Sequence, residues 1–248
     1  MCRGRSARGG RSNEQTTMRK LLTALACLFS GCRDEGNANS SAAKQDASKD
    51  DWGQKVVWLQ AGNQDNPFPQ KVLDCRAVAL GFTAMTSDRA IAASFNQLRT
   101  DDGHSLIGSL PNDDFIVPCD LRFPYNGKRE DGVLFSAPEM EDKWDFFAYD
   151  SRLYVRRSWT GLLLHVAELK YTDTEVVIST LHSNREVVHG DADFARAHLR
   201  FLILTHLGRK KLPFPIPPGA NLEDARAIAL AGFNSYGRRA EFASILKQ

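Results

Sequence analysis

The chain has 248 residues, of which 42% are hydrophobic, so it is long enough to bury a sizeable core. Its 32 basic and 30 acidic side chains give a net charge of +2, but six of the basic residues lie in the first 32 positions beside a single acidic one. The rest of the chain therefore carries a net charge of −3, which argues against nucleic-acid binding, because that function needs a lasting basic surface.

The most specific segment of the sequence runs from Met18 to Cys32. A basic Arg-Lys pair follows Met18, ten mostly apolar residues follow at 21–30, and a glycine precedes Cys32. A helix needs about 20 apolar residues to cross a bilayer, so this run is too short for a transmembrane anchor. We interpret it as the apolar region of an export signal.

This segment resembles the leader of bacterial lipoprotein precursors, in which a peptidase cuts immediately before the cysteine. The usual leucine at the third place before that cysteine is Phe29 here. The resemblance implies that Cys32 carries acyl chains and anchors the protein to a membrane of the bacterial cell envelope. It also implies that the remaining chain faces the periplasm or the exterior.

The leader divides the chain into three parts. We expect a signal peptide at 1–31, of which residues 1–17 fit an over-long gene start, because Met18 begins the more conventional leader. Residues 33–51 contain no aromatic or branched apolar residue, so they cannot bury enough surface to fold. We therefore expect a lipidated cysteine and flexible tether at 32–51, and a single globular domain at 52–248.

Two of the five cysteines, Cys75 and Cys119, lie in this domain. An exported protein can form a disulfide between them, which would close a loop of about 45 residues and stabilise the fold by about 4 kcal/mol. The other interpretation is two separate thiols that behave as small apolar side chains. The spacing alone does not decide between the two.

The first half of the domain predicts mainly strands. We expect a strand at 56–59, a strand at 72–85 with a bulge at Gly81, a helix at 88–98 capped by Ser87 or Asp88, and a polar loop at 100–114. An antiparallel meander is predicted from four β-rich runs separated by short turns, at 144–149, 152–157, 162–167 and 175–181. Residues 133–135 predict an added edge strand.

The end of the chain predicts helices. We expect a helix capped by Asp191 and closed by Gly208, an extended segment at 212–218, and two short helices at 222–233 and 238–246. Strands come first and helices last, without a βαβ alternation. The pattern therefore predicts an α+β fold, with an antiparallel β-meander core and a C-terminal set of helices packed against it.

An acidic run lies just before the meander. Glu139, Glu141, Asp142 and Asp145 concentrate four carboxylates in seven residues. Carboxylate oxygens suit general acid–base catalysis and the binding of a hard cation, so the first three are candidate catalytic residues. The alternative interpretation is a solvated acidic turn.

The string Arg-Arg-Ser-Trp-Thr-Gly at 156–161 is the second candidate site. On a strand, Arg156 and Arg157 point to opposite faces, so only one of them reaches a shared site. That arginine would clamp a carboxylate or phosphate, with Trp159 as a stacking wall for the ligand. Alternatively, one arginine pairs with the carboxylates upstream and Trp159 fills the core.

Common catalytic and cofactor motifs are missing from the sequence. It contains no Gly-x-Ser-x-Gly, no phosphate-binding glycine loop and no dinucleotide fingerprint. No histidine pair has the spacing of a metal site, and His182, His189 and Asp191 would need the fold to bring them together. We therefore expect no metal and no cofactor.

Two hypotheses of function follow. The favoured one is a non-catalytic lipoprotein that is held to a membrane by its lipid and binds an unknown envelope protein or ligand, but not nucleic acid. The alternative is an envelope hydrolase or transferase that uses the carboxylates at 139–145 with Arg156 or Arg157. A structure separates the two, because the second requires these groups to line a common pocket.

Overall fold

The computed structural model describes residues 52–129 and 131–246. The predicted signal peptide at 1–31, the lipid-attachment residue Cys32 and the tether up to residue 51 lie outside the described residues. Within the described part of the chain, no helix is long and apolar enough to cross a membrane.

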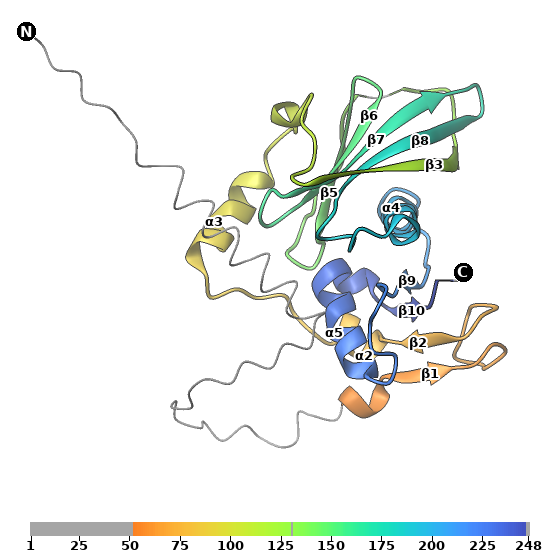
Figure 1. Ribbon diagram of the computed structural model, residues 1–248. Helices are drawn as coiled ribbons and strands as arrows, with labels where there is room; N and C mark the ends of the chain where they lie inside the picture. The colour runs from red at the N-terminus through yellow and green to blue at the C-terminus, as the bar shows by residue number, and fades with distance from the viewer. Residues whose placement is uncertain (1–51, 130, 247–248) are drawn as a thin grey trace, which may run out of the picture. The chain divides into compact units, whose positions relative to one another are not determined.

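The predicted meander is the centre of an antiparallel sheet of six strands (Figure 1). Its order β3-β8-β7-β6-β5-β4 places five consecutive strands, β4 to β8, side by side. Asp150 and Ser151, with φ of 50° and 58°, make the two-residue turn between β5 and β6. The strands are β3 (Asp114–Pro124), β4 (Gly132–Phe135), β5 (Trp144–Tyr149), β6 (Arg152–Arg157), β7 (Leu163–Tyr171) and β8 (Glu175–Asn184).

The edge strand β3 was not predicted. Pro118 lies inside it, and a proline within a run of residues argues against a central strand. The structure accommodates Pro118 because β3 lies at the edge of the sheet and pairs only with β8. The pairing register shifts between Pro118 and Leu121, which marks a bulge at this point.

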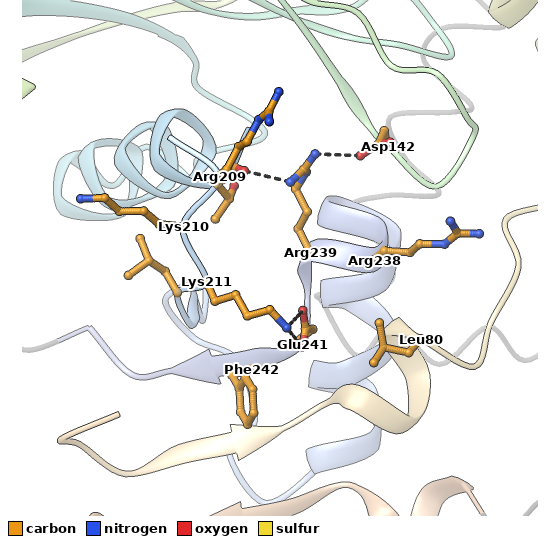
Figure 2. Close-up of a pocket in the computed structure, with 11 residues that line it drawn as sticks. Leu80, Asp142, Arg209, Lys210, Lys211, Arg238, Arg239, Glu241 and Phe242 are labelled. Atoms are coloured by element: carbon orange, nitrogen blue, oxygen red, sulfur yellow. Dashed lines mark hydrogen bonds and ion pairs between the residues drawn. The ribbon is translucent and has the colours of Figure 1, made fainter. Parts of the chain in front are cut away.

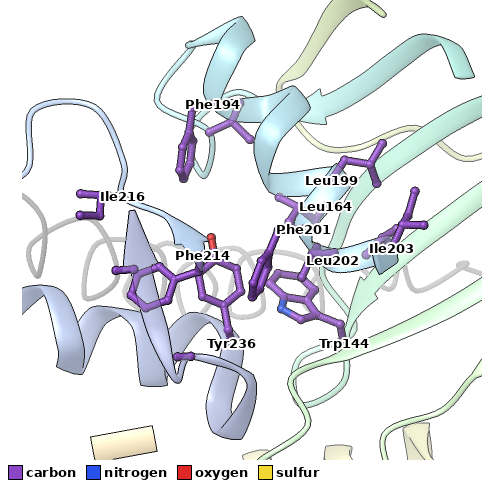
Figure 3. Packing of buried hydrophobic residues seen from close by; sticks show 14 of the residues in the cluster. Trp144, Leu164, Phe194, Leu199, Phe201, Leu202, Ile203, Phe214, Ile216 and Tyr236 are labelled. Carbon is purple, nitrogen blue, oxygen red and sulfur yellow. The ribbon is translucent and has the colours of Figure 1, made fainter. Parts of the chain in front are cut away.

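The helix α4 (Ala192–His206) packs against one face of this sheet (Figure 1). It begins as predicted at Asp191, whose carboxylate accepts a hydrogen bond of 2.7 Å from the amide of Phe194. Figure 3 shows its buried apolar side chains between the sheet and the segment that contains Phe214 and Tyr236. The antiparallel meander with C-terminal helices confirms the predicted α+β fold.

A second sheet of four short strands joins the two ends of the described chain. Its order is β1-β2-β10-β9, in which β10 runs antiparallel to β2 and parallel to β9. These strands are β1 (Val57–Leu59), β2 (Val72–Asp74), β9 (Phe214–Pro215) and β10 (Phe242–Ser244). The helices α2 (Arg76–Ala79) and α5 (Ala225–Tyr236) pack against each other beside it.

Two predicted helices are confirmed. The helix α3 (Arg89–Leu98) is capped by Asp88, whose carboxylate accepts hydrogen bonds from the amides of Ala90 and Ile91. The helix α5 lies close to the predicted range 222–233 and begins after Asp224.

Two other predicted elements are wrong. The strand expected over 72–85 ends at Asp74, whose carboxylate accepts a hydrogen bond from the amide of Arg76 and turns the chain into α2. The helix expected over 238–246 is a 3₁₀ turn, η3 (Gly237–Arg239), followed by β10. Residues 242–244 form a strand because β2 and β9, which are distant in sequence, offer them backbone partners on both sides.

The two domain cysteines are separate thiols. Cys75 is fully buried and its sulfur donates to the carbonyl of Leu73, while the sulfur of Cys119 donates to the carbonyl of Val117. Burial raises the pKa of the Cys75 thiol far above its ordinary value. The structure therefore shows two separate thiols and no disulfide between Cys75 and Cys119.

Gly237, between α5 and η3, gives a test of this packing. A Cβ atom added here would lie 1.6 Å from the carbonyl oxygen of Glu141, and φ is +59°. We expect Gly237→Ala to lower the free energy of unfolding by at least about 2 kcal/mol in chemical denaturation.

Gly219→Ala is the matched control for this variant. Gly219 also has a positive φ, of 78°, but nothing lies within 4 Å of an added Cβ atom. Only backbone strain then remains, at about 1 kcal/mol. An equal loss of stability in both variants would contradict the close contact between η3 and the turn at Glu141.

Candidate functional site

The acidic run at 139–145 begins in the connection between β4 and β5 and ends on β5, where Asp145 lies. Glu141 and Asp145 are buried and Asp142 is partly buried, so the run is not a solvated turn. Each of its four carboxylates contacts an arginine, and none of these arginines comes from the same turn. Ion pairs therefore connect the acidic run to β6 and to η3.

Asp145 and Arg156 form the most buried of these ion pairs. They lie opposite each other on β5 and β6, each side chain is 2% exposed, and Arg156 Nη2 lies 3.1 Å from Asp145 Oδ2. The other terminal nitrogen of Arg156 pairs with Asp101, in the loop after α3. Burial raises the pKa of the Asp145 carboxyl, although hydrogen bonds from the Ala137 amide and from Arg156 act against that rise.

The other carboxylates pair with the two arginines of η3. Arg238 lies 2.9 Å from Glu139 and 3.9 Å from Glu141, and Arg239 Nη2 lies 3.2 Å from Asp142 Oδ1. Glu141 also accepts a hydrogen bond of 3.2 Å from the amide of Ala84. Glu139, Glu141 and Asp142, the three candidate catalytic carboxylates, are thus all held by partners within the chain.

Arg157 and Trp159 are held by backbone carbonyl groups. Arg157 donates a hydrogen bond of 3.0 Å to the carbonyl of Ser235 and lies over the ring of Trp144, while its other terminal nitrogen donates to Asn234. Trp159 Nε1 donates a hydrogen bond of 2.9 Å to the carbonyl of Met140. These contacts bind the two side chains into the fold through partners that differ from those of Arg156.

Lys143 is a buried cation that the sequence analysis overlooked. Only 1% of the residue is exposed, and its Nζ donates a hydrogen bond of 2.8 Å to the carbonyl of Met140. The ammonium group lies 3.9 Å from the centre of the Trp159 ring. Burial, with the charge of Arg157, lowers the pKa of Lys143 to about 7, although Glu141 and Asp142 act in the opposite direction.

The histidines do not form a metal site. Within the described residues, no group of three or more His, Cys, Asp or Glu side chains is placed to hold a metal ion. His182 pairs with Asp114 at 2.8 Å, whereas His165 and His198 share a buried hydrogen bond of 3.0 Å. Burial lowers the pKa of His198 to about 3, so the inner pair is uncharged at neutral pH.

Asp142 also lines a pocket of about 370 Å³ (Figure 2). Its size falls within the range of small-ligand sites. Leu80, Leu212 and Phe242 give it an apolar wall, and Asp142 and Glu241 are its acidic residues. The basic residues that line it are Arg209, Lys210, Lys211, Arg238 and Arg239.

The basic residues come from two short runs that each follow a helix. Residues 209–211 follow α4, where the amides of Gly208 and Lys210 bond back to the carbonyls of Ile203 and Leu204 and close the helix. Residues 238–239 follow α5 in η3. Figure 2 shows Arg239 between them, with Lys210 and Arg238 on opposite sides.

The partners of these cations differ. Lys211 pairs with Glu241 at 3.0 Å, and Arg239, besides its bond to Asp142, donates a hydrogen bond of 2.8 Å to the carbonyl of Thr205. The Nε atom of Arg239 is buried and has no hydrogen-bond partner in the described part of the chain. Arg209 and Lys210 are exposed, and no described acidic group neutralises either of them.

No single feature of the sequence predicts this pocket. The runs Arg-Lys-Lys at 209–211 and Arg-Arg at 238–239 are visible, and each follows a glycine that ends a helix. Because nearly 30 residues separate them, only the tertiary structure shows that they meet. The pairing of η3 with the acidic turn is equally invisible in the sequence.

The low pKa of Lys143 gives a test of its burial. Between pH 7 and its ordinary pKa of 10.5, the unfolded chain binds a proton at Lys143 that the folded chain does not. This proton uptake favours the unfolded chain, so the free energy of unfolding falls as the pH falls from 10.5 towards 7. Above pH 10.5 the lysine is neutral in both states and has no such effect. We expect Lys143→Met to flatten the rise in unfolding free energy across this window, measured by denaturation at several pH values.

Lys170→Met is the control, because Lys170 is an exposed lysine on β7. It should keep the slope of the parent protein. An unchanged slope in Lys143→Met would contradict the buried ammonium group.

Comparison with known proteins found no matching family model, no similar curated protein and no similar solved structure. The assignment of function therefore depends on the residues and contacts described above. Those contacts distinguish two groups of charged side chains. The carboxylates and arginines of the two predicted sites are paired within the fold, and the basic pocket retains cations that are not.

Proposed function

We propose that this chain is a lipid-anchored protein of the bacterial cell envelope, whose domain at 52–248 acts by binding an envelope protein or ligand and not by catalysis. The leader at 18–32 and the low-complexity segment at 33–51 support the location. The anchor would hold the basic pocket within reach of envelope components, since the tether proposed for 33–51 would span about 24 Å on average as a flexible coil of 19 residues.

One observation carries the binding role: the predicted catalytic carboxylates all have arginine partners, whereas two of the five cations that line the basic pocket have no acidic partner among the described residues. Glu139, Glu141 and Asp142 are neutralised by arginines, so a reaction would first have to break these pairs. Arg209 and Lys210 need no such step, because they are exposed and without an acidic partner among the described residues. A site that is already open to a charged partner favours binding.

The alternative, a hydrolase or transferase, has one observation in its favour. A lysine with a pKa of about 7 is typical of a catalytic site, and Lys143 lies in the acidic turn. However, Lys143 is 1% exposed and is enclosed by Trp159 and Phe233, so no substrate reaches its amine in this structure. The binding role is the better supported of the two.

The anchor is tested by replacing Cys32. In the parent protein we expect mass spectrometry to find an acylated Cys32 as the N-terminal residue, and fractionation to find the protein with membranes. Cys32→Ala should abolish acylation, because it removes the residue to which the proposed lipid is attached. Cys27→Ala, a change in the same leader, should leave acylation intact.

An unmodified chain that begins at Met18 would contradict the lipid anchor. The same result would remove the main support for a location in the envelope.

The binding role is tested by affinity capture of the full chain from detergent-solubilised envelopes. We expect a component that is retained in proportion to the protein and is released at about 1 M salt, where charges are screened beyond about 3 Å. Capture of no salt-sensitive component would contradict binding through the basic pocket.

A further inference from the structure

We propose that the basic pocket binds the phosphate group of a phosphomonoester, with Arg209 and Lys210 as the residues that supply its unneutralised charge. This inference names a ligand class for the binding role and rests on that proposed function. It goes further because it names the residues that would bind the charge of the ligand and those that would contact its organic part.

The charge balance of the pocket sets the charge of the ligand. Three of its cations have acidic partners: Lys211 pairs with Glu241, Arg239 with Asp142, and Arg238 with Glu139. Arg209 and Lys210 then leave two positive charges without a counterpart. A phosphomonoester carries a charge of about −1.5 to −2 at pH 7, which matches this excess, whereas a single carboxylate supplies only half of it.

The end of α4 acts against an anion, but its effect is smaller. A helix C-terminus has a partial charge of about −0.5, and Arg209 and Lys210 follow that end directly. Two full positive charges on flexible side chains exceed this partial charge. The carbonyl of Thr205, at the same end, is also occupied by a hydrogen bond from Arg239.

Arg239 supplies a fixed positive charge at the pocket. Two of its nitrogens are held by Asp142 and Thr205, so its side chain is already oriented before a ligand binds. Because 27% of the side chain is exposed, its charge acts on an anion in the pocket. Figure 2 shows the Arg209 side chain near this guanidinium group, while the Lys211 amine is directed to Glu241. A phosphate group has three oxygens and so can accept from several donors at once.

The apolar wall favours an ester over free phosphate. Leu80 is 60% exposed at the pocket, and Leu212 and Phe242 also line it. An exposed leucine gains nothing from a bare anion, but it gains contact with the carbon chain of an ester. The pocket thus suits a phosphate group attached to a small organic part.

Isothermal titration of the detergent-solubilised full chain tests the proposal. Glycerol 3-phosphate represents a soluble ester, dihexanoyl phosphatidic acid represents a lipid headgroup, and inorganic phosphate represents the bare anion. Dihexanoyl phosphatidylcholine, which has no phosphomonoester, is the negative control. We expect at least one of the two esters to bind more tightly than inorganic phosphate, and the tighter ester identifies whether the source is soluble or lipid.

The variant Arg209→Gln with Lys210→Gln should weaken ester binding at least tenfold, because it removes both free charges. Its matched control is Arg89→Gln with Lys170→Gln, which also removes one arginine and one lysine from exposed positions. The control should bind like the parent protein. Both pairs should keep the parent's denaturation midpoint, since none of the four side chains has an acidic partner among the described residues.

Equal binding by the two double variants, or no binding of either ester to the parent protein, would overturn the proposal. If either result came together with salt-sensitive capture of an envelope component, the ligand class would be wrong while the binding role would stand. If capture also failed, the binding role itself would be wrong.

Discussion

The pairing of buried charges around the acidic turn is the constraint on which the rest of this structure depends. Asp145 and Arg156 are both 2% exposed, and a charge buried without a partner costs several kcal/mol. Their pairing across β5 and β6 fixes the start of the meander. The same turn carries Asp142, which pairs with Arg239 of η3 and so sets the position of the basic pocket.

Two kinds of charged side chain follow from this arrangement: those with an ion-pair partner within the fold, and the exposed Arg209 and Lys210, which have no acidic partner among the described residues. An exposed ion pair contributes about 0–1 kcal/mol, so the pairs at Glu139 and Lys211 add little stability, whereas removing one partner of the buried pair of Asp145 with Arg156 costs about 3–5 kcal/mol. A carboxylate that is already paired within the fold is a poor candidate for catalysis, because its charge is neutralised by its arginine partner. The internal pairing of the acidic run therefore supports our proposal that it connects parts of the fold beside a binding pocket and is not a reactive site.

The sequence predicted the elements whose evidence is local. Asp88 and Asp191 cap their helices as expected, and the meander follows from alternating β-rich runs and short turns. The errors concern elements that depend on distant partners: β10 forms because β2 and β9 lie beside it, and Pro118 concealed the edge strand β3. The alternative that one arginine of the Arg-Arg string pairs with the carboxylates upstream is confirmed by Arg156 and Asp145, but the pairing of the acidic run with η3 was not predicted.

The central claim is that the acidic run is held by internal ion pairs, and a double-mutant cycle on Asp145 and Arg156 tests it most directly. Asp145→Asn, Arg156→Met and the double variant would be compared with the parent protein by chemical denaturation. Each single change should be strongly destabilising, because it leaves the other charge buried alone. The account predicts a coupling energy of roughly 2 kcal/mol or more, whereas additive effects would contradict it.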